Sequence, residues 1–513
     1  MSLMSLMFVG VGAASGQVAA IDVNSEAGLR AAFDDVAETE ITLTGDVVLS
    51  DCGVGALVRP VGAVALVING GGFTLSQTCT GERVITNEGG SLELRDLTVT
   101  GGSLDVGAGE AFGGGVYSVG AMTLVDAVVA GNRADGSLGG VGGGVATEGP
   151  LRIESSVVTG NVAGGGESVF NGRGGGVYSN GPTEVVDSLI SGNVAAGAVA
   201  QGGAGGGLFI NERLELRRST VSGNTAEAGT SEGSGDFGGA VANGAMLVVN
   251  STVHANTAAG PGSGNGGVNA AGLLTLVYSA VTQNSAATGS ANVVFKPRDR
   301  SAGSVVAEPL GGAASCSGPV GVSGGFNFGG DASCGFVAGS DVEGAGDPGL
   351  GALSGGDGGL PVRRPMESGP LVDAIESGLC FAGDAAGVTT DQLGVARPQG
   401  DGCDIGPVEF VAAPPPSTDP TVPPTEPTAP PTEPTDPSTT VVATAPPTTV
   451  VSTSPTSPTV PSTVPPTTGD PEVPSGGLPG TGTTVGVVLL IAAGLVGVGL
   501  LVRRRASAGQ RAD

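Results

Sequence analysis

Hydrophobic and polar positions follow one pattern that the chain repeats six times between Gly113 and Ala286. Each repeat opens with a cluster rich in glycine, continues with short runs in which aliphatic and polar residues alternate, and closes on an asparagine. The closing asparagines, 28 to 32 residues apart, are Asn132, Asn161, Asn193, Asn224, Asn256 and Asn284. Self-similarity at such a period is typical of stacked repeats, in which each unit buries its apolar side against its neighbours.

Alignment on the closing asparagine separates the columns that we expect to be buried from those that we expect to be exposed. The columns eight and three residues before the asparagine are aliphatic in all six repeats, and the column two residues after it is always alanine. The column two residues before it holds small, mostly polar residues, which fit an outward face. Alternation with a period of two, broken by glycine, predicts short strands joined by tight turns. The two aliphatic columns are Leu124, Ile153, Val185, Leu216, Val248 and Leu276, and Val129, Val158, Ile190, Val221, Val253 and Val281.

Coils of about thirty residues with three short strands each can stack so that every strand pairs with its equivalent in the next coil. The predicted fold is therefore an all-β, right-handed parallel β-helix that rises about 4.8 Å per coil. A helical repeat is disfavoured, because each glycine would weaken a helix by roughly 1 kcal/mol. We expect the asparagine column to sit at a turn, with a left-handed backbone, and to form a polar ladder through the stack.

A helical period replaces the strand pattern once, between Asn24 and Val36. Asn24 or Ser25 can cap the first turn of this segment. A short amphipathic helix here would cover the open N-terminal end of the solenoid and hide its apolar cross-section. The expected buried face of the helix comprises Leu29, Ala32, Phe33 and Val36.

The composition supports a solenoid rather than a compact layered domain. The chain contains 97 glycines, no tryptophan and only 3% aromatic residues, so large side chains that could fill a thick core are scarce. A solenoid built from valine, leucine and alanine does not need them. The formal net charge is -28 and Lys296 is the only lysine, which argues against nucleic acid as a partner.

The six cysteines fall into three local pairs, and none has the C-x-x-C spacing of a zinc or redox site. Their even number, together with export signals, favours disulfides at the two ends of the solenoid, where coils lack a neighbour on one side. Six cysteines allow fifteen pairings, so the connectivity stays open. The local pairs are Cys52 with Cys79, Cys316 with Cys334, and Cys380 with Cys403.

Composition divides the chain into six segments. The apolar N-terminus has the core and small residues of a signal peptide but not its positive start, so we expect a truncated signal peptide, with a buried strand as the alternative. The Pro/Thr/Ser-rich segment cannot bury a core and is expected to be a disordered, extended stalk. The segments are residues 1–20 (signal peptide), 21–411 (β-helix with its N-terminal cap and closing region), 412–477 (stalk), 478–482 (sorting motif), 483–502 (transmembrane helix) and 503–513 (basic cytoplasmic tail).

Two patterns resemble those of known β-helix proteins. The repeat, GGGV followed by V-x-G-N, is similar to the polymorphic-membrane-protein repeat of secreted and surface β-helix proteins, although valine or isoleucine replaces its phenylalanine. The phrase from Asp391 to Glu409 resembles the end of many bacterial secreted β-helix proteins, D-x-x-G-x-x-R-P-x-G and then C-D-x-G-x-x-E. These resemblances imply the fold, a domain boundary and export, but no substrate.

The C-terminus resembles an LPxTG cell-wall sorting signal, which consists of a motif, an apolar span and a basic tail in that order. The apolar run from Val485 to Val502 is long enough to cross a bilayer, and Arg503 to Arg505 would stay on the cytoplasmic side. The resemblance implies that a sortase cuts after Thr481 and joins this residue covalently to peptidoglycan. It also implies a secreted cell-wall protein of a Gram-positive-type bacterium, membrane-spanning before sorting. A plain membrane anchor is the alternative. The sorting motif is Leu478, Pro479, Gly480, Thr481 and Gly482.

The sequence predicts no catalytic residues, no metal site and no cofactor. In the column six residues before the asparagine, Asp126 and Asp187 lie two coils apart, about 10 Å, which is too far for a retaining carboxylate pair. We interpret this column as a solvated face, and His254 as a surface histidine. No phosphate-binding loop, EF-hand loop or calcium-binding nonapeptide is present.

Two functional hypotheses remain. The first is a non-enzymatic, wall-anchored surface protein whose β-helix serves adhesion or display, with a carbohydrate or a host or environmental surface as its ligand. The second is a wall-anchored polysaccharide lyase or glycoside hydrolase that uses the loops at 164–173 or 227–237. These loops are mostly Gly, Ser and Ala, which suits linkers better than active sites.

Overall fold

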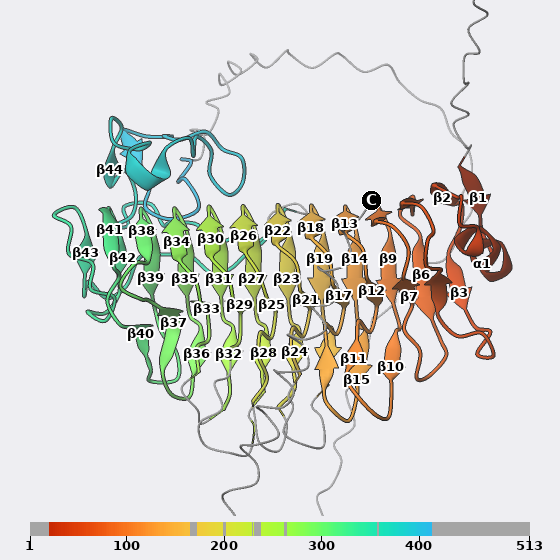
Figure 1. The fold of residues 1–513 in the computed structure, drawn as a ribbon. Coiled ribbons are helices and arrows are strands. Elements are labelled where there is room, and N and C mark those ends of the chain that lie inside the picture. The colour runs from red at the N-terminus through yellow and green to blue at the C-terminus, as the bar shows by residue number, and fades with distance from the viewer. Residues whose placement is uncertain are drawn as a thin grey trace, which may run out of the picture. The chain divides into compact units, whose positions relative to one another are not determined.

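The computed structural model describes residues 20–164, 172–197, 202–227, 229, 237–260, 264–355 and 359–412. Within these residues the chain winds into a parallel β-solenoid with one α-helix at its N-terminal end and very little other helix (Figure 1). The prediction of an all-β parallel β-helix is therefore confirmed.

A coil of the repeat region contains four short strands rather than the predicted three. The first full repeat consists of β12 (Val116–Ser118), β13 (Met122–Val125), β14 (Val128–Ala130) and β15 (Arg133–Asp135). Each strand pairs in parallel with its equivalent one coil further on. The fourth strand carries the alanine column, whose buried methyl groups allow the chain to run close to the next coil.

The described strands form four long parallel sheets, numbered here in the order in which a coil passes through them. Sheet 1 contains β4 (Leu57–Arg59), β7 (Ile85–Asn87), β12, β17 (Val145–Thr147), β21 (Val177–Ser179), β25 (Leu208–Ile210), β29 (Ala240–Ala242), β33 (Val268–Ala270), β37 (Ser290–Val294) and β40 (Ala314–Ser317). Sheet 2 contains β1 (Ile21–Val23), β2 (Glu40–Leu43), β5 (Leu66–Asn69), β8 (Leu92–Arg95), β13, β18 (Leu151–Glu154), β22 (Thr183–Val186), β26 (Leu214–Arg217), β30 (Met246–Val249), β34 (Leu274–Val277), β38 (Arg300–Ala302) and β41 (Val322–Gly325).

The other two long sheets complete each coil. Sheet 3 contains β3 (Val47–Leu49), β6 (Thr74–Gln77), β9 (Thr98–Thr100), β14, β19 (Val157–Thr159), β23 (Leu189–Ser191), β27 (Thr220–Ser222), β31 (Thr252–His254), β35 (Ala280–Thr282), β39 (Val305–Ala307), β42 (Phe328–Gly329) and β43 (Val342–Glu343). Sheet 4 contains β10 (Ser103–Asp105), β15, β20 (Val162–Ala163), β24 (Val194–Ala195), β28 (Thr225–Ala226), β32 (Thr257–Ala258) and β36 (Ser285–Ala286). Two small pairs are β11 (Ala111–Phe112) with β16 (Gly140–Val141), and β44 (Ile375–Glu376) with β45 (Gly402–Cys403).

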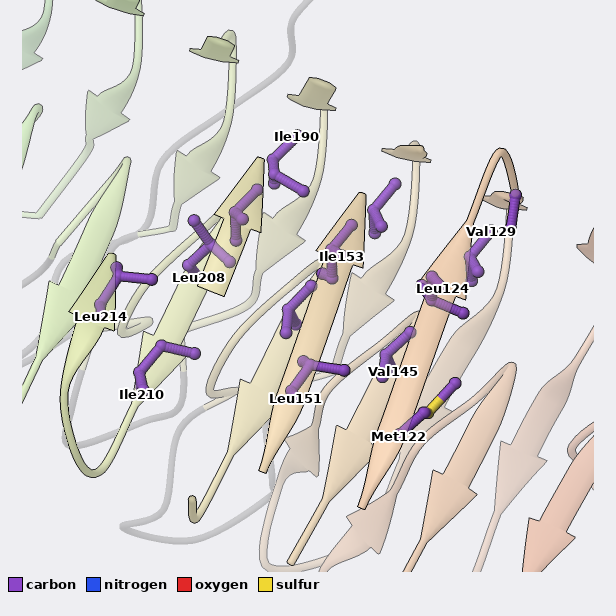
Figure 2. Close-up of a cluster of buried hydrophobic side chains, with 14 of the residues drawn as sticks. Met122, Leu124, Val129, Val145, Leu151, Ile153, Ile190, Leu208, Ile210 and Leu214 are labelled. Atoms are coloured by element: carbon purple, nitrogen blue, oxygen red, sulfur yellow. The ribbon is translucent and has the colours of Figure 1, made fainter. Parts of the chain in front are cut away.

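The aliphatic columns predicted to face inward form the core of the stack. Figure 2 shows Leu124 and Ile153 from sheet 2, and Val129 and Ile190 from sheet 3, among the side chains that fill the interior. All twelve residues of the two columns are completely buried. In each column the side chains of adjacent coils stack at strand spacing, so apolar surface is removed from water continuously along the axis.

The glycine cluster is required where successive coils touch backbone to backbone. Gly113 has a positive φ of 65°, and a Cβ at this position would lie 2.3 Å from the carbonyl oxygen of Val116. A Cβ on Gly114 would lie 2.3 Å from the carbonyl oxygen of Arg133 in the same coil and 2.5 Å from that of Gly143 in the next coil. Because these neighbours are backbone atoms that cannot rotate away, a larger residue would force the coils apart.

The repeat asparagines form a buried ladder inside the solenoid. Each Nδ2 donates to the Oδ1 of the asparagine in the next coil at 2.9 to 3.1 Å, and the same Oδ1 accepts the preceding asparagine's backbone N–H. The ladder continues beyond the repeats to Asn292. Contrary to expectation, the backbone of the repeat asparagines is not in the left-handed conformation. The turn residue is instead the one before each of the six, which has a positive φ in Gly131, Gly160, Gly192, Gly223, Ala255 and Gln283.

The N-terminal cap is α1 (Glu26–Asp34). Ser25 is the N-cap, and its hydroxyl accepts the N–H of Gly28 at 3.3 Å. Leu29 and Phe33 are fully buried in the core, as predicted, but the helix ends before Val36, which is 49% exposed. The helix therefore ends two residues before the last apolar residue of its predicted face.

A buried arginine fixes the end of this cap. Arg59, in β4, is fully buried, and its guanidinium donates to the carbonyl oxygens of Phe33 at 3.0 Å and Glu38 at 2.6 Å. These carbonyls lie at and just after the C-terminal end of α1, where orphan acceptors need partners.

The chain after the last coil folds back along the side of the solenoid. We call residues 347–412 the C-terminal clasp; in Figure 1 its later part, with β44, lies beside the last coils of the stack. It packs against the outer faces of sheets 2 and 3, through a second apolar cluster that includes Val277, Tyr278 and Ile375. The clasp covers outward positions that the repeat pattern alone leaves exposed.

Disulfides join the three local cysteine pairs. Cys52–Cys79 links two of the first coils, and Cys316–Cys334 lies at the C-terminal end of the stack. The third bond, Cys380–Cys403, lies within the clasp rather than at an end of the solenoid. It joins the segment after β44 to β45.

Candidate functional site

The predicted sorting motif lies outside the described residues. Leu478 to Gly482, the stalk and the apolar segment 483–502 all follow residue 412. Among the residues that the structure describes, no helix is long and apolar enough to cross a membrane, and no group of three or more His, Cys, Asp or Glu side chains could hold a metal ion. The loops considered for an active site, 164–173 and 227–237, lie largely outside the described ranges.

The column with Asp126 and Asp187 is a turn, not the flat face of a strand. Its residues have positive φ angles, 51° at Asp126 and 50° at Asp187, and they connect sheets 2 and 3. Arg218, one coil further on, binds both carboxylate oxygens of Asp187 at 2.7 Å. The carboxylate of Asp187 is thus engaged in an ion pair, and this column contains no acid and base placed for catalysis. The same column is not solvated throughout, because Asn250 and Tyr278 are buried beneath the clasp.

His254 is buried, which corrects its interpretation as a surface histidine. It lies at the end of β31, in the column expected to face outward, and is only 8% exposed because the clasp covers it. Its Nδ1 lies 3.3 Å from the hydroxyl of Thr282. Burial, with the nearby positive charge of Arg363, lowers the pKa of His254 to about 4. The clasp similarly buries Ser222 and Thr282, so the outward column is solvated only in its earlier coils.

Gln392 attaches the clasp to the solenoid. It belongs to the segment from Asp391 to Glu409 that resembles the end of secreted β-helix proteins. Its side chain donates to Thr220 Oγ1 at 2.9 Å and accepts from Thr252 Oγ1 at 2.7 Å, bridging two successive coils of sheet 3. Asp391 joins two parts of the clasp, because its carboxylate accepts the backbone N–H groups of Val395 at 2.8 Å and Glu409 at 3.0 Å.

Arg397 and Glu409 of the same phrase form an ion pair that is almost completely excluded from solvent, with side chains 0% and 1% exposed. The guanidinium of Arg397 also lies 4.1 Å above the ring of Tyr278 and donates to Asn250 Oδ1 at 3.2 Å. Burial raises the pKa of Tyr278 to about 12, so its hydroxyl stays protonated and donates to the carbonyl oxygen of Cys380 at 2.6 Å. The contacts of Arg397, Glu409, Asn250 and Tyr278 all join parts of the clasp to one another or to the solenoid. We therefore assign these residues a structural role.

Aromatic side chains gather on the outer face of sheet 1. Tyr178 stacks on Phe209 of the next coil, with ring centroids 5.9 Å apart and planes inclined by 8°. Phe112 contacts both Tyr117 and Tyr178, at centroid distances of 6.0 and 6.2 Å. Arg173 lies 5.6 Å from the ring centroid of Tyr178. Two of the three tyrosines of the chain thus lie together on one outward surface.

A chain of amides borders these aromatic residues at the corner between sheets 1 and 2. Asn243 donates to Asn211 Oδ1 at 2.7 Å, and Asn211 donates to the hydroxyl of Tyr178 at 2.8 Å and to Asn180 Oδ1. Asn180 in turn donates to the exposed carboxylate of Glu148. Four successive coils therefore present one hydrogen-bonded row of side chains toward solvent.

A groove of roughly 250 Å³ runs beside this row on the sheet 2 side. It is lined by Pro150 and Pro182, at equivalent positions of two coils, and by Arg152, Glu184 and Arg213. Arg152 is paired with Glu184 of the next coil, so the wall carries both charges. A second hollow of roughly 540 Å³ follows the same corner near Lys296 and Arg298.

The repeat alignment contains a signal for this surface that sequence reasoning missed. Tyr117, Tyr178 and Phe209 each lie fifteen residues before a repeat asparagine, and Asn180 and Asn211 lie thirteen before one. The strand alternation that predicted the core also places these columns outward. Aromatic residues recurring in an outward column are unusual in a chain with so few of them.

No protein-family model, curated protein sequence or solved structure matches the chain.

Proposed function

We propose that the protein is a cell-wall-anchored, surface-displayed β-solenoid with a non-enzymatic binding or adhesion role. The order of motif, apolar span and arginines from Leu478 to Arg505 carries the proposal, because a plain membrane anchor needs only the last two parts. The three disulfides agree with an oxidising, extracellular setting. The right-handed winding of the coils, a transmembrane helix over 483–502 and covalent transfer by a sortase to peptidoglycan through Thr481 belong to this proposal.

Display without catalysis is the form of the proposal that the described side chains support best. In the column six residues before the asparagine, the carboxylate of Asp187 is held by Arg218 in a two-point ion pair. The side chains of the segment from Asp391 to Glu409 are engaged in attaching the clasp to the solenoid. The polysaccharide lyase or hydrolase remains the alternative. Release of reducing or unsaturated ends by the full-length protein from a panel of plant and bacterial polysaccharides would establish that alternative.

Thr481→Ala tests the anchor, with Thr483→Ala as the matched control just outside the motif. We expect the unchanged protein and the Thr483→Ala variant to stay with purified wall through detergent and to be released by wall-degrading enzymes. The Thr481→Ala variant should move to the membrane fraction, since the bond that a sortase would cut is altered. Recovery of all three proteins in the detergent extract would contradict wall anchoring.

A further inference from the structure

The groove and the amide row form one continuous surface on the solenoid. We define the corner face as the outward side chains of residues 117–123, 146–152, 178–184 and 209–215. Outward and buried positions alternate along the two strands of each range, so a column with Tyr117, Tyr178 and Phe209 lies near one with Asn180 and Asn211 and near one with Arg152, Glu184 and Glu215. Each column repeats at about 4.8 Å along the stack.

We propose that the corner face binds a neutral, linear polysaccharide that lies along the axis of the solenoid. This inference rests on the proposed function as a surface-displayed binding protein and names its ligand class. A ligand whose units repeat along a line suits a surface whose binding groups repeat along a line, because each added unit gains the same contacts.

The functional groups of the corner face favour a polyhydroxylated ligand. The amides of Asn180 and Asn211 carry both donors and acceptors, which match hydroxyl groups that also do both. Tyr117 and Phe209 are partly exposed, so edges of their rings are available to the apolar faces of sugar rings. Pro150 and Pro182 add rigid apolar floor to the groove and lose no side-chain entropy when a ligand binds.

The charges of the corner face favour a neutral ligand over an ionic one. Arg152 pairs with Glu154 and Glu184, and Arg213 pairs with Glu215, so each guanidinium in the groove is already matched by a carboxylate. A polyanion would have to displace these carboxylates and would also approach a protein of net charge -28. A polycation would have to compete with the same arginines for these carboxylates.

The test compares the binding of the full-length protein, purified in mild detergent, to cellulose, chitin, starch and polygalacturonate. Two corner variants are used: Asn180→Ala with Asn211→Ala, and Arg213→Ala, which removes a side chain that is 63% exposed. The matched control is Thr159→Ala with Ser191→Ala, which removes a similar polar pair, 3.1 Å apart, from the outer face of sheet 3.

We expect saturable binding to at least one neutral polymer, about a tenfold loss of affinity in the double asparagine variant and a smaller loss in Arg213→Ala. The sheet 3 control should bind like the unchanged protein. Binding that is unaffected by both corner variants, a preference for polygalacturonate, or no binding to any polymer would each overturn the inference. Wall attachment of the same variants is measured separately, by fractionating the cells that produce them, so a failure to bind glycan is distinguished from a failure of anchoring.

Discussion

His254 shows how one side chain acquires its properties from a distant part of the chain. In the repeat alignment it occupies the same column as Ser222 and Thr282, which accept or donate hydrogen bonds at little cost. A histidine in this column must stay neutral once the clasp covers it, because burial and Arg363 disfavour its charged form.

We predict that His254 makes the protein sensitive to mild acid. The pKa is about 4 in the folded state and 6.5 as its ordinary value, so the unfolded state binds the proton first as the pH falls. The stability contributed by the neutral ring is complete above pH 6.5 and decreases as the pH falls toward 4. In urea denaturation at pH 7 and pH 4.5, His254→Thr should lose less stability between the two values than the unchanged protein. Equal losses would show that the histidine is not the titrating group.

The asparagine ladder predicts a large penalty for loss of one rung. Asn193 donates to Asn224 Oδ1 and to the carbonyl of Val158, both at 2.9 Å, and accepts two N–H groups of Asn161. Asn193→Ala leaves several of these buried groups without a partner, which should cost on the order of 3 kcal/mol of unfolding free energy. Asn243→Ala, an exposed asparagine, should change it by less than about 0.5 kcal/mol. A similar midpoint for both variants in urea denaturation would contradict a stabilising role for the ladder.

The C-terminal clasp is the element that depends most on a single buried contact. Arg397→Met would leave the buried carboxylate of Glu409 unpaired, at a cost of about 3 to 5 kcal/mol. We expect limited proteolysis to cut this variant within 347–412 while the coils stay resistant. The double variant Arg397→Met with Glu409→Leu should be less sensitive, since neither charge remains. The exposed pair offers the control: Arg152→Met should behave like the unchanged protein. Equal protease resistance of all variants would mean that the pair does not hold the clasp.

At the scale of the whole molecule, the sequence was informative wherever structure is local and repeated. The columns of Leu124 and Val129 predicted the core because strand alternation and a constant coil length fix which side chains point inward. The helix was found by its period, although Val36 shows that periodicity does not fix where a helix ends. The fourth strand was missed because two or three residues give too short a pattern.

The parts that could not be predicted all depend on contacts between residues far apart in the sequence. Nothing in the local pattern around His254 or Tyr278 indicates that residues 347–412 will cover them. The phrase from Asp391 to Glu409 was conspicuous, but its contacts with Thr220 and Thr252 exist only in the folded chain. The corner face was open to prediction in part, since aromatic and amide residues recur in its columns, although Ala146 and Glu148 interrupt them.

The disulfide of the clasp determines how the domain responds to a pull on its C-terminal end. Tension applied at residue 412 first meets the buried hydrogen bonds of Glu409 and then reaches Cys403. There the covalent bond to Cys380 passes the load directly to the earlier part of the clasp. Residues 381–402, which include Gln392 and Arg397, are bypassed and remain unloaded. The side chains of Gln392 and Arg397, which bind the solenoid, therefore lie in a loop that tension does not stretch.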